Sequence, residues 1–308
     1  MQLSLIIVTY NSEKYIESCI NSILESIETF EDYEIIIIDN SSKDKTVQLI
    51  ENFLNPNIKI IREECNKGYS SAINKAVFKS RFEKILILNP DTLIIKDAAL
   101  AMFKASCQPD VGIVGAKLLN SDETFQLSSR RHFPNLGILF SYILSLDKIF
   151  HKNKFFGKYN YTYLDEDDEV FVDSVSGACM MFSKKLFTSM GGFDESFFIY
   201  FEDTDFCLRV KDAGFKVLYY PDAQVVHHND YSDNYSIKTF YFYQSFEKFI
   251  YKYTVRWHRG CSTSGRKSFP RLAPVQAMFG TAERPHAALG ALQRPECPQL
   301  ATLDAPRT

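Results

Sequence analysis

Residues 3–11 have the sequence LSLIIVTYN, an almost continuous apolar run that ends at Thr9, Tyr10 and Asn11. A short run of this composition is typical of a parallel strand that is buried on both faces of its sheet. Apolar residues then recur with helical spacing from residue 16 to residue 24, behind Ser12, a residue type that caps helices. The segment therefore predicts a strand followed by a helix, the repeating unit of an α/β fold.

The same alternation extends to residue 88. We predict further strands at residues 34–38, 58–61 and 85–88, and further helices at residues 44–53 and 70–79. This order favours one parallel, doubly wound sheet, because parallel neighbours must be joined by a crossover helix. Ligands of such sheets bind beyond the carboxyl ends of the strands, so the polar residues that follow each strand are candidates for function.

The chain after residue 88 is less regular. We predict strands at residues 111–118, 124–128, 178–182, 216–220 and 224–227, and helices at residues 184–190, 203–213 and 237–256. Gly214 follows the second of these helices, as expected of a C-terminal cap. The aromatic-rich residues 136–163 match neither period and receive no assignment.

The composition changes abruptly near residue 256. All 26 isoleucines and all 17 tyrosines precede that point, whereas six of the 11 prolines follow it. Residues 257–308 carry a net charge of +4, and the rest of the chain carries −7. We therefore predict a disordered tail that does not belong to the domain. The abruptness favours an altered reading frame or a fused segment over a basic binding tail or an unselected extension.

Composition also excludes several classes of protein. A net charge of −3 and a pI near 6.1 lack the basic footprint of proteins that bind nucleic acid. The N-terminal apolar run is too short for a secretory signal, and the scattered cysteines form no C-x-x-C pair, so we expect a cytoplasmic protein without structural zinc. The glycine motifs of dinucleotide-binding folds and P-loops are absent.

Polar residues follow two of the predicted strands at the edge where ligands bind. Asp39 and Ser41, within residues 39–44, can hydrogen-bond the base or ribose of a nucleotide. The alternative is that this segment only starts the next helix, with Ser42 as its cap and Asp44 near the positive end of its dipole. Asp91, in the sequence Asn89-Pro90-Asp91, offers a hard oxygen ligand that suits Mg²⁺ or Mn²⁺ together with substrate phosphates. A plain turn is the alternative for that segment.

Carboxylates also cluster within residues 191–205, interleaved with aromatic side chains. Such a cluster can hold a general base in a mostly apolar pocket, where burial raises the pKa of a carboxyl group and nearby cations lower it. The alternative is a helix start in which Asp203 is the cap and Asp205 lies in the first turn. His227, at the end of the last predicted strand, is either a structural histidine or a nitrogen ligand for the ion that Asp91 binds.

Eight segments in order are similar to the family-2 inverting glycosyltransferases of the GT-A fold, and to their rhamnosyltransferase-like branch in bacterial surface-polysaccharide assembly. They are residues 7–11, 39–42, 66–69 with Asn74, 88–92, 177–180, 191–195, 202–205 and 221–227. The resemblance implies a single mixed, Rossmann-like α/β sheet flanked by helices. It places a GT-A domain at residues 1–235 and the start of a C-terminal helical region, able to lie at a membrane surface, at residues 236–256.

The resemblance also implies roles for individual residues. Asp203 would be the general base, and Asp91 and His227 would hold Mg²⁺ or Mn²⁺. The donor would be bound by Thr9, Tyr10, Asn11, Asp39, Ser41, Asn66, Gly68, Asn74 and Asp91. The acceptor or sugar pocket would contain Gly177, Asp194, Glu195, Glu202 and Asp205.

The activity so implied is inverting transfer of a sugar, with dTDP-L-rhamnose as the expected donor. The expected acceptor is a polyprenyl-diphosphate-linked glycan of O-antigen or another surface polysaccharide, met on the cytoplasmic face of the membrane. Two departures from the family pattern stand out. Asn89 replaces the first acid of the D-x-D motif, and the resemblance stops near residue 253, before the further helices that the family usually has. A nucleotidyltransferase of similar fold and an inactive, truncated product are the alternatives.

Overall fold

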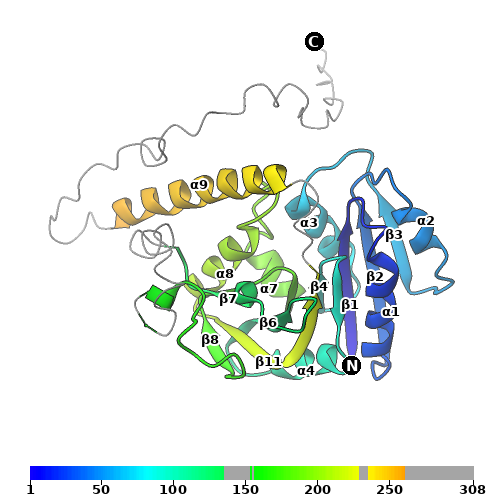
Figure 1. The fold of residues 1–308 in the computed structure, drawn as a ribbon, viewed down its shortest axis with the longest axis horizontal. Helices are drawn as coiled ribbons and strands as arrows, with labels where there is room; N and C mark the ends of the chain where they lie inside the picture. The colour runs from blue at the N-terminus through cyan, green and yellow to red at the C-terminus, as the bar shows by residue number, and fades with distance from the viewer. Residues whose placement is uncertain (135–152, 155, 229–234, 261–308) are drawn as a thin grey trace, which may run out of the picture.

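A computed structural model describes residues 1–134, 153–154, 156–228 and 235–260 of the chain. Its centre is a nine-stranded mixed sheet in the order β3-β2-β1-β4-β10-β6-β11-β5, with β8 paired to β11 (Figure 1). The strands are β1 (Gln2–Thr9), β2 (Asp32–Asp39), β3 (Ile58–Arg62), β4 (Lys84–Leu88), β5 (Thr92–Ile94), β6 (Val111–Leu119), β8 (Val170–Val172), β10 (Cys179–Ser183) and β11 (Lys216–His227). This arrangement confirms the predicted α/β class with a single mixed sheet.

The first four strands form the parallel half of the sheet. β1 lies between β2 and β4 and is parallel to both, and β3 is parallel to β2. Alternate residues of β1 enter two different apolar clusters, so this strand is buried on both faces, as its sequence predicts. Thr9 pairs in register with Asp39, which brings the polar ends of β1 and β2 side by side.

The second half of the sheet mixes strand directions. β10 is antiparallel to β4 and β6, β11 is parallel to β6, and β5 and β8 are antiparallel to β11. The two strands predicted at residues 216–220 and 224–227 are in fact one strand. Its register shifts between Tyr220 and Gln224, beside Pro221, because proline cannot donate a ladder hydrogen bond.

Two local predictions were wrong. Residues 124–128 do not form a strand: only an isolated bridge joins Leu119 to Phe125, and a 3-10 turn, η1 (Leu127–Ser129), follows. The physical reason is the tight turn before it, in which Glu123 has a φ of 63°. Ser12 does not cap the first helix either, because its hydroxyl accepts a hydrogen bond from the backbone of Tyr10 instead.

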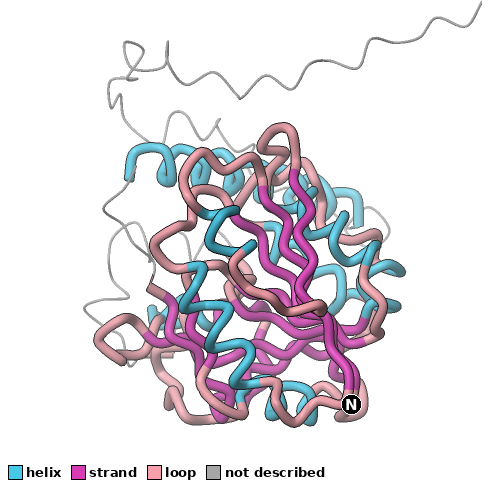
Figure 2. Tube along the Cα trace, turned by 90° about the vertical axis from the view of Figure 1, so that its right-hand side faces the viewer, coloured by secondary structure: helices cyan, strands magenta, loops and turns pink. Residues whose placement is uncertain are grey.

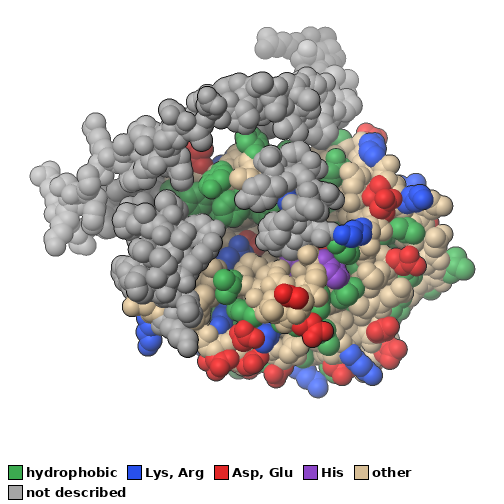
Figure 3. Space-filling view, viewed as in Figure 1, with side chains coloured by type: hydrophobic (Ala, Val, Ile, Leu, Met, Phe, Trp, Pro, Cys, Tyr) green, Lys and Arg blue, Asp and Glu red, His purple; other side chains and the backbone are tan. Residues whose placement is uncertain are grey.

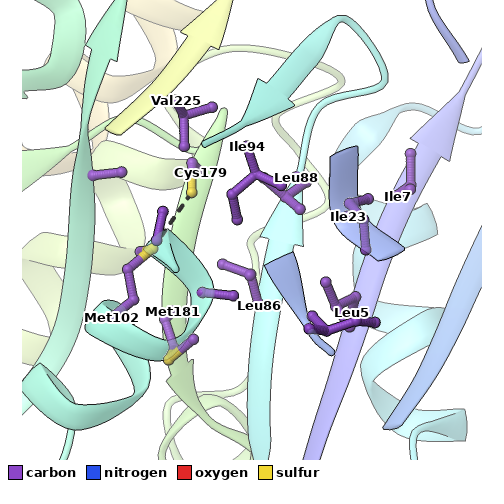
Figure 4. Close-up of a cluster of buried hydrophobic side chains, with 14 of the residues drawn as sticks. Leu5, Ile7, Ile23, Leu86, Leu88, Ile94, Met102, Cys179, Met181 and Val225 are labelled. Atoms are coloured by element: carbon purple, nitrogen blue, oxygen red, sulfur yellow. Dashed lines mark hydrogen bonds between the residues drawn. The ribbon is translucent and has the colours of Figure 1, made fainter. Parts of the chain in front are cut away.

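Helices cover both faces of the sheet (Figures 1 and 2). One face packs against α1 (Ile16–Ser26), α2 (Thr46–Glu51) and α4 (Ala98–Ala105), and the other against α3 (Tyr69–Lys79), α7 (Lys184–Ser189) and α8 (Glu202–Asp212). Figure 4 shows part of the first core, in which the Cys179 thiol contacts the Met102 sulfur among aliphatic side chains. These buried layers fix the strand ends that carry the polar residues.

The last described helix, α9 (Tyr235–Gly260), lies across α8 (Figure 1). It confirms the helix predicted at residues 237–256 and continues past the domain boundary predicted at residue 257. Phe249 and Tyr253 are buried against the segment before α8, whereas Phe240 and Tyr251 are exposed. Residues 261–308, most of the predicted tail, lie outside the described residues.

Charges on the described surface are mixed. On the face drawn in Figure 3, acidic side chains gather along the lower edge and basic side chains lie among them. Within the described ranges, no helix is both long enough and apolar enough to cross a membrane. A small second sheet pairs β7 (Arg130–Arg131) with β9 (Ser174–Val175) beside the N-terminus of α8.

Candidate active site

The adjacent ends of β1 and β2 form an ordered polar tip. The Thr9 hydroxyl donates to Asp39 Oδ1 over 3.0 Å, and the backbone N–H of Ser42 donates to Asp39 Oδ2 over 3.0 Å. Asn11 Oδ1 accepts from the backbone of Lys43 over 2.8 Å, which ties the loop after β1 to the loop after β2. Asp39 is 2% exposed, so its buried carboxylate holds the ends of β1 and β2 together through these hydrogen bonds.

Several residues of the tip, Tyr10 and Ser41 among them, remain accessible to a ligand. The Tyr10 side chain is 51% exposed, and Ser41 is half-buried with a φ of 67°. A non-glycine residue in this left-handed region costs on the order of 1–3 kcal/mol, and such residues concentrate at functional sites. The tip thus combines a buried, hydrogen-bonded carboxylate with an exposed aromatic ring.

The residues predicted around α3 have mainly internal partners. Asn66 accepts from the backbone of Gly68 over 2.9 Å, and Gly68 adopts a φ of 89° where a Cβ atom would lie 2.7 Å from Phe198. The Asn74 amide bonds the backbone of Phe193 in both directions and also donates to Glu195 over 2.9 Å. We therefore propose a structural role for Asn74, which holds the loop before α8 against α3.

Asp91 and His227 meet at the carboxyl-end edge of the sheet. β5 begins directly after Asp91, and its first residue, Thr92, pairs in register with His227 of β11. His227 Nε2 lies 3.4 Å from Asp91 Oδ1 and 3.4 Å from the Asn89 side-chain amide. Burial raises the pKa of Asp91, but a protonated His227 at this distance, a backbone hydrogen bond and the charge of Lys238 together lower it.

The pair fits a divalent ion that substrate phosphates help to hold. No group of three or more acidic, histidine or cysteine side chains with metal-site geometry occurs in the described part of the chain. One carboxylate can nevertheless suffice for Mg²⁺ when substrate phosphates supply further oxygens, and Nε2 of His227 would be an additional nitrogen ligand. The His227 Nε2 and Asp91 Oδ1 atoms are neighbours, and His227 is 9% exposed and therefore held in place.

Asp203 lies in the first turn of α8 with every carboxylate oxygen engaged. Its Oδ2 accepts from the Arg131 guanidinium over 2.6 Å and from the backbone of Gly177 over 2.9 Å. Its Oδ1 accepts from the backbone N–H of Thr204 over 2.6 Å. A Cβ atom at Gly177 would come within 3.2 Å of the Asp203 Cβ, so glycine permits this close approach. The ion pair with Arg131 compensates the buried charge.

The backbone before α8 is strained, and α9 supports it. Tyr200 and Phe201 both have a φ of 68°, a conformation that bulky residues rarely adopt. Phe201 is buried, and its ring packs against Phe246 and Phe249 of α9 at centroid distances of 5.5 Å each. This packing stabilises the conformation from which α8 starts at Glu202.

Glu202, beside Asp203, is a buried acid in an electrostatically unfavourable position. It is 5% exposed, and its Oε2 has no hydrogen-bond partner among the described residues. Burial is the main cause that raises the pKa of Glu202 to about 8; Asp203 and Asp205 raise it further, and Arg131 opposes them. Glu202 is therefore largely protonated at neutral pH, next to the proposed base.

The raised pKa predicts how stability depends on pH. Between about pH 4.5 and pH 8 the native state retains the proton that the unfolded chain releases, so stability falls as pH rises through this window. We expect Glu202→Gln to remove this fall, on the order of 1 kcal/mol per pH unit. Urea unfolding of both proteins at pH 5 and pH 8 measures it. Glu17→Gln, at an exposed position, is the control and should lose as much stability between pH 5 and pH 8 as the wild type. An equal loss in Glu202→Gln would show that Glu202 does not cause the pH dependence.

Three predicted pocket residues instead lie in a network that joins α8 to α9. Asp205 is fully buried and accepts from Arg209 and from Lys252, and Lys252 also bonds Asp194 over 2.7 Å. Lys252 lowers the pKa of Asp194 to about 2 against the opposing effect of burial. Asp194, Glu195, Arg209 and Lys252 line a groove of about 430 Å³, and its charged groups largely satisfy one another. We propose that the network positions α9.

Arg131 and Gln126 were missed from the sequence. Arg131 bonds Asp203 across 72 residues of chain, and Gln126 bonds His227 across 101 residues. In each pair the two residues belong to different parts of the chain. Helical or strand periodicity and helix-capping patterns therefore cannot predict either contact. The double arginine at residues 130–131 was the available hint, since a buried carboxylate requires a compensating cation.

Comparison with known proteins gives two family matches. Residues 4–190 match the model of glycosyl transferase family 2, and residues 166–231 match a model described as the N-terminal domain of galactosyltransferase. The first match contains the polar tip and Asp91, and the second contains Asp203 and His227. Together they span the site described above.

Curated relatives and solved structures agree. An N-acetylglucosaminyl-diphospho-decaprenol L-rhamnosyltransferase of Mycobacterium tuberculosis is 27% identical over 75% of this chain and 77% of its own length. Rhamnosyltransferase WbbL of Escherichia coli K12 is 26% identical over 88% of this chain and 98% of its own length. The fold is similar to a mannosyltransferase from Pyrobaculum calidifontis in complex with GDP-Man and Mn²⁺, with a TM-score of 0.55, 18% identity and coverage of 76% of this chain and 59% of that chain.

Proposed function

This chain belongs to glycosyl transferase family 2, and we propose that it transfers L-rhamnose from dTDP-L-rhamnose to a lipid-linked glycan with inversion at the anomeric carbon. The two rhamnosyltransferase relatives support the sugar, and the decaprenol-diphosphate name of one supports a polyprenyl-diphosphate acceptor. The observation that carries the proposal is the meeting of Asp91 and His227 beside the polar tip of β1 and β2. A nucleotidyltransferase gains no support from either family match.

The donor's nucleoside would lie on the tip formed by Thr9 and Asp39, with Tyr10 against the base. Asp91 and His227 would hold a divalent ion, with Mn²⁺ as the ion present in one solved structure of this fold. When bound, such an ion neutralises the charge that develops on a departing diphosphate. The ordered loop contacts of Asn11 and Ser42 then keep the donor from shifting during reaction.

The acceptor hydroxyl would approach from the side of α8. Asp203 would take its proton, and the resulting oxygen would form the new bond to the anomeric carbon while the bond to the nucleoside diphosphate breaks on the opposite face. Configuration inverts because one displacement occurs. Protonated Glu202 offers a hydrogen-bond donor beside Asp203 for a sugar oxygen, and we propose that it helps orient the acceptor.

Binding of the donor is tested with the full chain and a panel of nucleotide sugars. We expect dTDP-L-rhamnose with Mn²⁺ to raise the unfolding temperature more than UDP-GlcNAc or GDP-mannose, because a ligand at 100 times its Kd adds about 2.7 kcal/mol of stability. Omission of Mn²⁺ should remove most of this effect. A preference for another sugar would reject the donor, and no stabilisation by any of them would reject the function.

A further inference from the structure

Gln126 lies in the turn after β6 and touches His227. It is 7% exposed, and its Oε1 lies 2.9 Å from His227 Nδ1. The other imidazole nitrogen, Nε2, faces Asp91. Each ring nitrogen of His227 therefore has a defined neighbour. Whether Nδ1 carries a proton depends on which atom of the Gln126 amide, the oxygen or the nitrogen, faces it.

The orientation of the Gln126 amide follows from its other contacts. Its Nε2 lies 3.1 Å from Asn120 Oδ1 and 3.5 Å from the backbone oxygen of His227. A carbonyl oxygen can only accept a hydrogen bond, so the amide atom that faces it must be the –NH₂ group. Asn120 is itself fixed, because its amide donates over 2.9 Å to the Thr124 hydroxyl, whose own proton is donated to Asp122 Oδ1. The amide oxygen of Gln126 consequently faces His227.

This orientation determines the tautomer of the imidazole. An amide oxygen accepts only, so His227 Nδ1 must carry a proton in order to bond Gln126. A neutral imidazole has one N–H, which leaves a lone pair on Nε2. That lone pair faces the Asp91 carboxylate at 3.4 Å, an arrangement that is repulsive unless a metal ion lies between the two groups or Nε2 takes up a second proton and donates it to Asp91.

We propose that Gln126 is a positioning residue that holds His227 as the Nδ1–H tautomer and so presents the Nε2 lone pair, beside Asp91, to a divalent ion. The inference rests on the proposed function in that the ion is the one the donor diphosphate would share. Partners of the second ring nitrogen commonly fix the orientation and basicity of metal-binding histidines. A purely structural Gln126 would close the turn without any effect on the tautomer.

The tautomer is measured directly in the full chain without metal. Long-range proton–nitrogen correlation spectra of ¹⁵N-histidine-labelled protein at pH 8.5, where an ordinary histidine is neutral, identify the protonated nitrogen, and His227→Ala assigns the signals. We expect wild-type His227 to carry its proton on Nδ1. We expect Gln126→Met, which keeps the length but removes the amide, to show a substantial population of the Nε2–H form. A wild-type proton on Nε2 would overturn the proposal whether or not the variant folds.

Metal affinity gives the second test. In the presence of saturating dTDP, we expect Gln126→Met to bind Mn²⁺ about 10–100-fold more weakly than wild type, as measured by electron paramagnetic resonance of free Mn²⁺. Ser128→Ala, which removes a 3.2 Å contact to Gln126 Oε1 but leaves the amide in place, is the matched control and should stay within about twofold. Equal affinity in Gln126→Met and wild type would overturn the inference. Failure of the wild type to bind Mn²⁺ with any nucleoside diphosphate would instead reject the proposed function.

Discussion

Replacing Asp203 with asparagine is expected to lower sugar transfer by about 10²–10⁴-fold, the usual contribution of a general base. Asparagine cannot accept the proton of the acceptor hydroxyl at neutral pH. The loss should appear in kcat, whereas the Kd of the Mn²⁺–donor complex should change little, because the residues proposed to hold that complex, Asp91 and His227, lie at β5 and β11 rather than on α8. Turnover with a polyprenyl-diphosphate acceptor and donor-binding titration measure the two quantities separately.

The variant needs a stability control. Both carboxylate oxygens of Asp203 accept from N–H groups, so one side of an asparagine amide would face a donor, either that of Arg131 or that of Thr204. We therefore expect some loss of stability, and rates must be compared well below the unfolding temperature. Asp212→Asn, at the exposed end of the same helix, should retain wild-type turnover. If Asp203→Asn keeps more than about a tenth of the wild-type rate, Asp203 is not the base.

Replacing Asp91 with asparagine is expected to lower turnover about 100-fold and to weaken Mn²⁺ binding. The substitution preserves shape but removes the only carboxylate of the proposed ion site. Metal neutralisation of a leaving group contributes several kcal/mol, and each 1.36 kcal/mol corresponds to a factor of ten in rate. Turnover as a function of Mn²⁺ concentration separates weaker metal binding, which high Mn²⁺ rescues, from a lower maximal rate.

Asp97→Asn is the matched control for this experiment. Asp97 is exposed, lies six positions further along the chain, and has a φ of 67° that asparagine also tolerates. It loses the same charge without touching His227, so its Mn²⁺ dependence should match that of the wild type. An unchanged Mn²⁺ dependence in Asp91→Asn would show that Asp91 does not hold the ion.

Local sequence patterns were sufficient for most elements of this fold. The apolar run at residues 3–9 predicted a strand buried on both faces, and β1 indeed contributes alternate side chains to two cores. They failed at residues 124–128, where only one isolated bridge forms and a 3-10 turn follows, because alternating hydrophobicity does not reveal the turn at residues 120–124 that ends the strand pairing. Local patterns also predicted two strands separated at Pro221, whereas β11 continues past this residue with a shift in its pairing register.

The candidate site divides in the same way. Local sequence patterns identified the polar residues that follow strands, so Asp39, Asp91 and His227 could be named as candidates before their neighbours were known. Only the tertiary structure decided that the Asn89–Asp91 turn meets His227, 138 residues after Asn89, that Arg131 neutralises Asp203, and that Gln126 faces the imidazole. The reason is physical: helix and strand periods depend on neighbours within a few residues, whereas these contacts depend on the order in which nine strands pair.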